Sequence, residues 1–319
     1  MIEINSIKAR TFSKLGQRGT IFAIATPELA EQFPEMLVLT ADLALLSGLD
    51  RFIQKYPDRF YNMGISEQNM VGVAAGLAAE GWKPVVTTYS SFLSMRSCEQ
   101  IRHFGGYMKS NILFVGSGAG FSMTYSGNTH YTVEDLAIMR AIPNMIVLSP
   151  SDAVCAIKAY EAALKYENPV YIRLSGGLNC PMVYKDDFDF EIGKAITLEK
   201  GADIQLIATG LMVSTALKVA ELLKKEGHSV EVIDMHTIKP IDKSVIASKD
   251  RLIVTIEEHN VFGGLGGAVS EVMTEKGICT PLLRLGIPDT FLKVGDVEYL
   301  LDQAGLSVEK IISAIQNRL

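Results

Sequence analysis

The sequence lacks long apolar runs, paired cysteines and an excess of positive charge. No uninterrupted apolar stretch approaches the roughly 18 residues that a membrane-spanning helix needs, so we expect no membrane span. The four cysteines, at positions 98, 155, 180 and 279, form no CxxC pair, which disfavours a zinc site and favours a reducing, cytoplasmic setting. The 36 acidic residues outnumber the 30 basic ones, for a net charge of −6, which argues against a nucleic-acid-binding protein. The first residues carry charge and lack the apolar core of a signal peptide, so we do not expect secretion.

What the sequence does contain is an alternation of short apolar runs with longer helical stretches. Buried strands are expected at residues 85–89, 112–115 and 145–148, and then at 204–208, 229–233 and 252–256. Helices are expected at residues 68–80 and 152–166, and then at 213–225, 264–275 and 308–316. Apolar strands that alternate with helices predict parallel sheets covered on both faces. The fold class is therefore α/β, with two doubly wound domains and mainly parallel sheets.

The alternation is interrupted at residues 178–192. This stretch is acidic and non-periodic and shows no core-facing pattern, so we interpret it as a linker. A chain of 319 residues has room for two domains of about 100–200 residues each. We therefore place the boundary near residue 185, which divides the chain into residues 1–185 and 186–319.

Glu67 is a candidate functional residue at the start of the helix predicted over residues 68–80, with Ser66 as its N-cap. A carboxylate in a first helical turn is stabilised by the helix dipole by about 0.3–1 kcal/mol, which is one explanation for its position. The helix is too apolar to lie on the surface, so the carboxylate is expected to be buried, and buried carboxylates are typical proton-transfer groups. The residues alone leave both explanations open.

Other candidates are weaker when each is taken by itself. Tyr89 and Phe92 follow a predicted strand and are core aromatics by default, and a lone loop histidine such as His130 is more often a packing residue. Residues 263–267 (GGLGG) do not have the GxGxxG spacing of a dinucleotide site, so close helix packing is the better interpretation. His259, after two glutamates at a strand end, is a weaker site candidate still.

Taken together, several motifs resemble the transketolase superfamily of thiamine-diphosphate enzymes. In the first domain they are YPDRFYNMGISEQNMV (56–71), GLAAEGWKP (76–84), YSSFL (89–93), GNTH (127–130), AIPN (141–144) and SPSD (149–152). In the second domain they are VIDMHTIKP (232–240) and TIEEHNVFGGLG (255–266). The motifs run in order along essentially the whole chain. The resemblance implies a pyrimidine-binding domain followed by the C-terminal domain of that superfamily.

The resemblance also implies roles for individual residues around thiamine diphosphate. Glu67 is expected to hydrogen-bond the ring nitrogen of the aminopyrimidine, and Phe92 to stack on that ring. Tyr89 is expected to line the same pocket. The segment TADL at 40–43 resembles a strand end of the family, so Leu43 is expected to wedge the bent cofactor, with Asp42 nearby. His130 resembles the histidine that contacts oxygens of the donor substrate.

Several positions depart from the family pattern. Gln68 stands where many transketolases carry a histidine. A His-Asp pair is replaced by Gly118 and Ala119, an acidic residue by Ser126, and an arginine that contacts phosphate by Gly176. These changes put sugar-phosphate recognition in question more than cofactor chemistry. Arg96 or Arg173 is expected to compensate as a substrate contact, and the glycine-rich segment 116–120 predicts an open, flexible loop.

The resemblance further implies a missing partner. The family binds the diphosphate through Mg²⁺ with a Gly-Asp-Gly motif in a separate domain, and no Gly-Asp-Gly occurs in this sequence. We therefore expect an N-terminal subunit that holds the Mg²⁺ and shares thiamine diphosphate with this chain, which itself has no metal site. A heterotetramer with two copies of each chain is the expected assembly.

The leading functional hypothesis is the C-terminal subunit of a split transketolase that moves a two-carbon ketol unit between sugars or sugar phosphates. Three alternatives remain open. One is the β-subunit of a 2-oxoacid dehydrogenase, another is a deoxyxylulose-phosphate-synthase-like half, and the last is a non-catalytic scaffold subunit.

Overall fold

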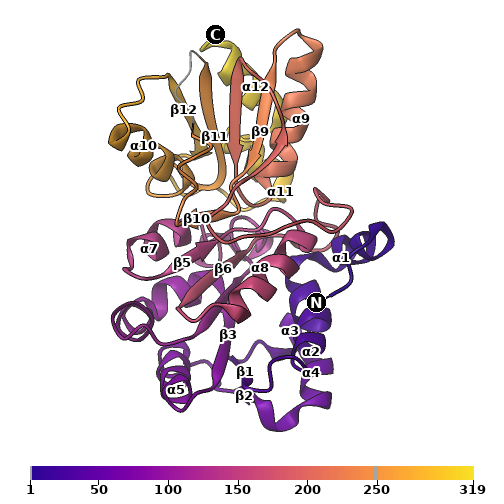
Figure 1. Ribbon diagram of the computed structural model, residues 1–319, viewed down its shortest axis with the longest axis vertical. Coiled ribbons are helices and arrows are strands. Elements are labelled where there is room, and N and C mark those ends of the chain that lie inside the picture. The colour runs from indigo at the N-terminus through magenta and orange to yellow at the C-terminus, as the bar shows by residue number, and fades with distance from the viewer. Residues whose placement is uncertain (1, 247–250) are drawn as a thin grey trace.

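Two sheets, one above the other along the long axis of the molecule, organise the chain (Figure 1). The computed structural model describes residues 2–246 and 251–319. The first sheet has the strand order β10-β5-β6-β4-β3-β1-β2, and the second has the order β12-β11-β8-β9-β7. Every pairing is parallel except β10 with β5 and β7 with β9. The predicted fold class of two mainly parallel α/β domains is confirmed.

Most strands of the first sheet come from the apolar runs of the N-terminal half, and one strand comes from the C-terminal half. Its strands are β1 (Met36–Thr40), β2 (Phe60–Asn62), β3 (Lys83–Tyr89), β4 (Leu113–Ser117), β5 (Ile146–Leu148), β6 (Val170–Leu174) and β10 (Thr237–Lys239). From β1 to β6 every strand residue is buried except in the edge strand β2. Continuous burial of this kind is what a sheet covered on both faces requires.

Helices cover both faces of the first sheet. One side carries α1 (Ser6–Gly19), the π-helical turn η1 (Thr20–Ala25), α2 (Thr26–Leu29), α4 (Asp50–Lys55) and α8 (Ala153–Lys165). The other side carries α5 (Glu67–Ala79), α6 (Cys98–Gln100), α7 (Asp135–Ala141) and the π-helical turns η3 (Phe92–Arg96) and η4 (Ile101–Tyr107). Short elements α3 (Ala44–Ser47), η2 (Pro57–Arg59) and η5 (Thr124–Thr129) lie in connections.

The second sheet follows the predicted strand and helix series closely. Its strands are β7 (Ile196–Glu199), β8 (Ile204–Ala208), β9 (Val230–Asp234), β11 (Leu252–Asn260) and β12 (Leu282–Ile287). Its helices are α9 (Met212–Lys225), α10 (Leu265–Glu275), α11 (Val297–Gln303) and α12 (Val308–Gln316). The apolar face of α10 joins the same core as α5 and α7, so one core continues across both sheets.

One strand crosses between the two halves of the chain. β10 leaves the second sheet after β9 and pairs antiparallel with β5, as Thr237 opposite Leu148 and Lys239 opposite Val147. This exchange could not be foreseen from the sequence, in which residues 232–240 form one continuous motif. In the structure, Figure 1 shows β10 at the junction of the two sheets.

The segment expected to be a solvated linker is packed. Residues 175–195 form no helix or strand, yet Cys180 and Tyr184 are buried. The backbone N–H of Tyr184 donates to Asp152 Oδ2 at 2.8 Å, and its hydroxyl donates to Asp234 Oδ2 at 2.9 Å. Phe188 stacks on the Tyr184 ring at 3.8 Å between centroids. The expectation of a segment without a core face is therefore wrong, because widely spaced aromatic residues anchor it without a regular period.

None of the helices in the described part of the chain is long and apolar enough to cross a bilayer.

Candidate active site

Glu67 begins α5, which the chain enters from the loop after β2. The helix predicted over residues 68–80 is confirmed as Glu67–Ala79, and Ser66 stands at its N-cap position. The Ser66 hydroxyl donates to the Met63 carbonyl at 2.6 Å and forms no cap hydrogen bond to α5, so the expected side-chain cap is wrong. Glu67 is only 5% exposed. Both explanations offered by the sequence, dipole stabilisation and a buried functional carboxylate, fit this position.

Tyr89, Phe92 and His130 form one cluster of rings from three separate segments. Tyr89 ends β3, Phe92 begins η3, and His130 follows η5. The ring centroid of Phe92 lies 5.6 Å from that of Tyr89 and 5.3 Å from that of His130, and the latter two lie 6.0 Å apart. All three contacts are edge-to-face, a favourable arrangement of ring quadrupoles. Two motifs, YSSFL (89–93) and GNTH (127–130), therefore meet in space.

Arg96 connects the ring cluster to Glu67. Its Nη1 donates to Glu67 Oε1 at 2.8 Å, and its guanidinium carbon lies 3.7 Å from the centroid of the Phe92 ring. Gln68 Nε2 donates to the Arg96 carbonyl at 3.0 Å. The substrate contact suggested for Arg96 stays a prediction, and in this structure its guanidinium contacts Glu67 and Phe92.

Arg173 does not reach this cluster. Its side chain is 2% exposed, and its Nε donates to the two carboxylate oxygens of Asp135 at 3.0 and 3.1 Å. Its Nη2 donates to the carbonyls of Thr132 and Glu258 at 3.2 and 2.8 Å. These partners bind Nε and Nη2 in the contact between the two halves of the chain. The substrate contact suggested for Arg173 stays a prediction.

The glycine-rich segment 116–120 is not the open loop that the sequence predicted. Residues 116–120 are all buried. The backbone N–H of Gly120 donates to the Thr132 carbonyl at 2.8 Å, and the N–H of Phe121 donates to Glu258 Oε1 at 2.9 Å. The second domain therefore packs on this segment and fixes it, which glycine content alone could not indicate.

Asp42 and Leu43 follow β1, at the edge of the sheet where Tyr89 ends the neighbouring parallel strand β3. No hydrogen bond or ring contact among residues 2–246 and 251–319 joins either of them to the ring cluster. Asp42 has φ 57° and its N–H donates to Asn62 Oδ1 at 3.0 Å, so a left-handed turn is held here by the neighbouring strand. Leu43 is half-buried and directly precedes α3.

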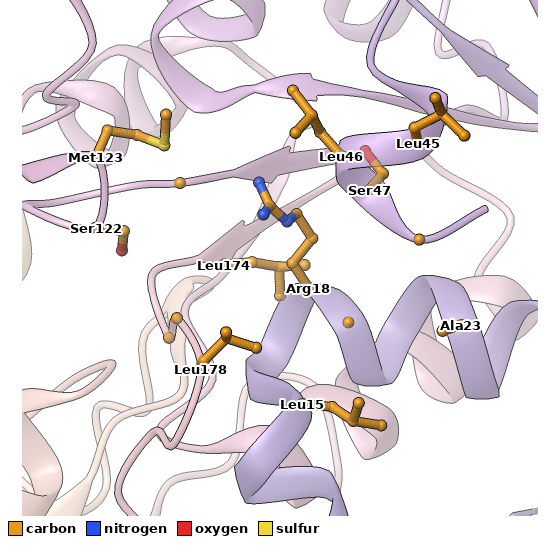
Figure 2. Close-up of a pocket in the computed structure, with 15 residues that line it drawn as sticks. Leu15, Arg18, Ala23, Leu45, Leu46, Ser47, Ser122, Met123, Leu174 and Leu178 are labelled. Atoms are coloured by element: carbon orange, nitrogen blue, oxygen red, sulfur yellow. The ribbon is translucent and has the colours of Figure 1, made fainter. Parts of the chain in front are cut away.

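Figure 2 shows a cavity of about 280 Å³ that the sequence did not indicate. Leu45 and Leu46 of α3 line it, as do Met123 and Gly118, and a Cβ placed on Gly118 would lie 3.5 Å from Tyr89. Figure 2 shows Arg18 projecting into it from the end of α1. Gly176, a position where the resemblance led us to expect an arginine, also lines it.

Arg18 is the residue that sequence reasoning missed. Among the described lining residues it is the one charged side chain, and it forms no hydrogen bond or ion pair with any described residue. An unpaired guanidinium facing a cavity is suited to an anionic ligand. Its flanking glycines, Gly16 with φ 71° and Gly19, were the available signal, because Gly16 interrupts the helix and turns the chain at this point.

Buried ionisable groups of the second domain face the first. Burial raises the pKa of the Glu257 and Glu258 carboxyls to about 7. Glu257 accepts hydrogen bonds from the N–H groups of Leu265 and Gly266, so the glycine-rich helix start binds a carboxylate of its own chain. Burial lowers the pKa of His259 to about 4, and its Nε2 accepts from the Ala137 N–H at 3.3 Å. Glu258 and His259, whose partners Phe121 and Ala137 belong to the first domain, therefore link the two domains, whereas Glu257 is bound within the second.

The fold and the site define a class of thiamine-diphosphate-dependent transferase, and the chain belongs to the transketolase family. Residues 18–180 match the transketolase pyrimidine-binding domain, and residues 193–311 match the transketolase C-terminal domain. These matches lie on either side of residue 185, where the boundary was predicted. The domain content is that of the C-terminal section of a transketolase.

Individual relatives agree with this assignment. A putative transketolase C-terminal section of Methanocaldococcus jannaschii is 40% identical over 294 residues, which cover 92% of this chain and 93% of that protein. A 6-deoxy-6-sulfo-D-fructose transketolase subunit of Clostridium sp. (strain MSTE9) is 40% identical, over 90% of this chain and 89% of the relative. A 1-deoxy-D-xylulose-5-phosphate synthase of Dictyoglomus thermophilum is 37% identical over 93% of this chain but only 49% of its own length.

A solved structure described as a split gene transketolase, inactive beta4 tetramer, superposes with a TM-score of 0.87 at 37% identity. The match covers 95% of this chain and 98% of that one. The chain therefore has nearly the extent of a known split-transketolase subunit.

The family implies thiamine diphosphate, and the residues present fit its aminopyrimidine. Glu67 offers a nearly buried carboxylate whose Oε2 accepts no hydrogen bond from the described part of the chain. Phe92 offers a partly exposed ring beside it. A carboxylate acceptor next to an aromatic surface matches a planar heterocycle that carries N–H donors.

Proposed function

We propose that this chain is the C-terminal subunit of a two-subunit transketolase, which transfers a two-carbon ketol unit from a ketose donor to an aldose acceptor. The observation that carries the proposal is that Arg96 joins the Glu67 carboxylate to the ring cluster that holds Phe92 and His130, in a chain of this family. The cofactor would supply the carbanion chemistry, while the protein orients it and excludes water.

The roles proposed for the side chains follow from their positions. Glu67 accepts a hydrogen bond from the aminopyrimidine ring nitrogen, and Phe92 stacks on that ring with Tyr89 lining the pocket. Leu43 and Asp42 are proposed to contact the cofactor from the end of β1, since they follow a strand of the same sheet edge. His130, in edge contact with Phe92, is proposed to bind oxygens of the donor sugar.

A partner subunit is part of the proposal. The N-terminal subunit would bind the diphosphate through Mg²⁺, in a cytoplasmic heterotetramer with two copies of each chain. The relative with nearly the same extent, described as an inactive beta4 tetramer, supports the need for a second subunit. We expect the isolated chain to bind thiamine diphosphate poorly, and tight binding in calorimetry would contradict the split-enzyme proposal.

The test mixes this chain with the N-terminal subunit and measures ketol transfer. Glu67→Gln is expected to lower kcat by about 100-fold or more, in line with the loss of a positioned proton-transfer group. Glu80→Gln is the matched control, because Glu80 is an exposed glutamate at the other end of α5. An unchanged rate for the Glu67 variant would refute the catalytic assignment, and a mixture that binds cofactor but transfers nothing would support the scaffold alternative.

The Arg18 cavity is proposed to hold the far end of the sugar. With one unpaired cation and several leucines, it fits an anionic terminal group of a sugar. Arg18→Met is expected to raise the KM for phosphorylated and sulfonated sugars by about tenfold or more and to leave unsubstituted sugars unaffected. Because one relative is named for a sulfo-sugar, the panel should include sulfonates.

A deoxyxylulose-phosphate-synthase-like activity is the second candidate. It is favoured by the 37% identity to a synthase of which this chain spans about half. Detection of 1-deoxy-D-xylulose 5-phosphate as the product of the mixture, without ketol transfer between sugars, would select it over the first proposal.

A further inference from the structure

We propose that Arg96 is a positioning residue that orients Glu67 and Phe92 toward the cofactor's aminopyrimidine, rather than a contact for the sugar. The inference rests on the proposed function, since it takes these two residues as the groups that face the cofactor. It assigns Arg96 a role through its neighbours and none in contact with the reacting atoms.

The way Arg96 binds the Glu67 carboxylate supports a positioning role. Arg96 binds it through one oxygen only, with Nη1 2.8 Å from Oε1. In the described part of the chain Oε2 receives no hydrogen bond, so one oxygen is anchored and the other is left for a ligand N–H. A bidentate pairing would have occupied both oxygens and blocked the carboxylate.

Arg96 also contacts Phe92, the ring proposed to stack on the cofactor. The two residues lie four positions apart in η3, and the guanidinium carbon is 3.7 Å from the ring centroid. This is well within the range of a cation–π contact, so the same side chain that anchors Glu67 restrains the ring. Tyr89 and His130 contact Phe92 edge-to-face at 5.6 and 5.3 Å, and together the three neighbours define the orientation of the ring.

Burial of Glu67 and the hydrogen bonds around Arg96 also support a positioning role. The Glu67 side chain is 6% exposed and that of Arg96 is 48% exposed, so the arginine supplies a counter-charge from the solvent side to a carboxylate that is costly to bury alone. The Gln68 side chain also donates to the Arg96 carbonyl at 3.0 Å. Two hydrogen bonds therefore tie the start of α5 to the end of η3, which links the carboxylate and the ring as one unit.

The experiment compares Arg96→Met with wild type in the complex with the N-terminal subunit. Calorimetry is expected to show thiamine diphosphate binding weakened by about tenfold or more, with a matching rise in the half-saturating cofactor concentration. The KM for the sugars is expected to stay within about twofold. Arg96→Lys keeps the charge without the planar stack and is expected to recover part of the cofactor affinity. Arg102→Met is the matched control, because Arg102 is exposed and contacts only the adjacent His103 among the described residues.

Three results would overturn the inference. A raised sugar KM with unchanged cofactor affinity would make Arg96 a substrate contact. Tighter cofactor binding by the Met variant would mean that Arg96 occupies the place of the cofactor. If the Met variant bound the cofactor as tightly as wild type, Arg96 would position nothing. If the Met variant does not fold, the cofactor affinity of Arg96→Lys is used for the same comparison. A wild-type complex that neither binds thiamine diphosphate nor transfers ketol units would refute the proposed function itself.

Discussion

Asp135→Asn is predicted to destabilise the chain by about 3–5 kcal/mol, because it leaves the buried Arg173 guanidinium without its paired carboxylate. Both side chains are almost fully buried, at 2% and 0% exposed, and Arg173 Nε contacts both oxygens of the carboxylate. Tyr171 adds a hydrogen bond from its hydroxyl to Asp135 Oδ2 at 2.8 Å. An amide in place of the carboxylate keeps the shape but removes the charge.

Urea unfolding of the isolated chain, followed by circular dichroism, measures the loss. Lys225→Met is the matched control, since Lys225 forms an exposed ion pair with Glu221 one turn away, with side chains 65% and 68% exposed. That pair is exposed to solvent and is expected to contribute little to the free energy of unfolding. Replacing Asp135 and Arg173 together by leucine is expected to cost less than the sum of the two single changes, because no unpaired charge remains.

A loss below about 1 kcal/mol for Asp135→Asn, comparable with the exposed control, would refute the reasoning that Arg173 depends on this carboxylate. Enzyme kinetics test the role of Arg173 independently of the stability measurement. If a folded Arg173→Met variant raised the KM for phosphorylated sugars alone, the original expectation of a substrate contact would stand and the structural role would be wrong.

Two further predictions concern the contact of Glu258 with the first domain. Burial raises the pKa of Glu258 to about 7, so the folded chain keeps a proton that the unfolded chain releases near pH 4.5, and wild-type stability falls as the pH rises through that window. Glu258→Gln is therefore expected to be more stable than wild type by up to about 3 kcal/mol at pH 8 and equally stable at pH 4. Urea unfolding measures this, and a difference in unfolding free energy that is the same at both pH values would contradict the prediction. Gly120→Ala is expected to cost about 1–3 kcal/mol, because its Cβ would lie 2.4 Å from the Glu258 carboxyl at φ 62°. Gly76 lies in an exposed helical position with open space around its Cβ, so Gly76→Ala is expected to stabilise the chain by about 0.5–1 kcal/mol. If thermal melts showed the melting temperature of both glycine variants changing in the same direction, the steric argument would be refuted.

The elements that were predicted well are those whose signal is local. Asp152 was expected to open a helix, and its Oδ1 accepts the Cys155 N–H at 2.7 Å at the N-cap of α8. Runs such as residues 85–89 and 204–208 became buried strands because β-branched and apolar side chains favour a sheet covered on both faces. Helix α5 was located from its run of apolar and small residues after the expected N-cap Ser66.

The failures involve partners that are distant in sequence. The buried pairing of Arg173 with Asp135 was not foreseen, because Asp135 lies 38 residues earlier and only the packing of α7 against the sheet brings the two together. β10 was missed because its pairing partner β5 lies about ninety residues away. Arg18 was overlooked because the cavity it faces is assembled from several separate segments. Periodicity reports which face of an element is buried, but not what covers it.

The site in the first domain depends on the second domain, and this changes what a boundary at residue 185 means. The end of β11 contacts the segment that leads to and from His130, since Glu258 accepts from the Phe121 N–H and the Asn260 N–H donates to the Val133 carbonyl at 2.7 Å. The same strand end supplies the carbonyl that binds Arg173. A fragment of residues 1–185 would lose these contacts together with β10, which would expose the β5 edge and leave part of the shared core uncovered. A boundary at residue 185 therefore does not divide the chain into two independent structural units, because β10 of the second part completes the first sheet and the His130 loop contacts both parts.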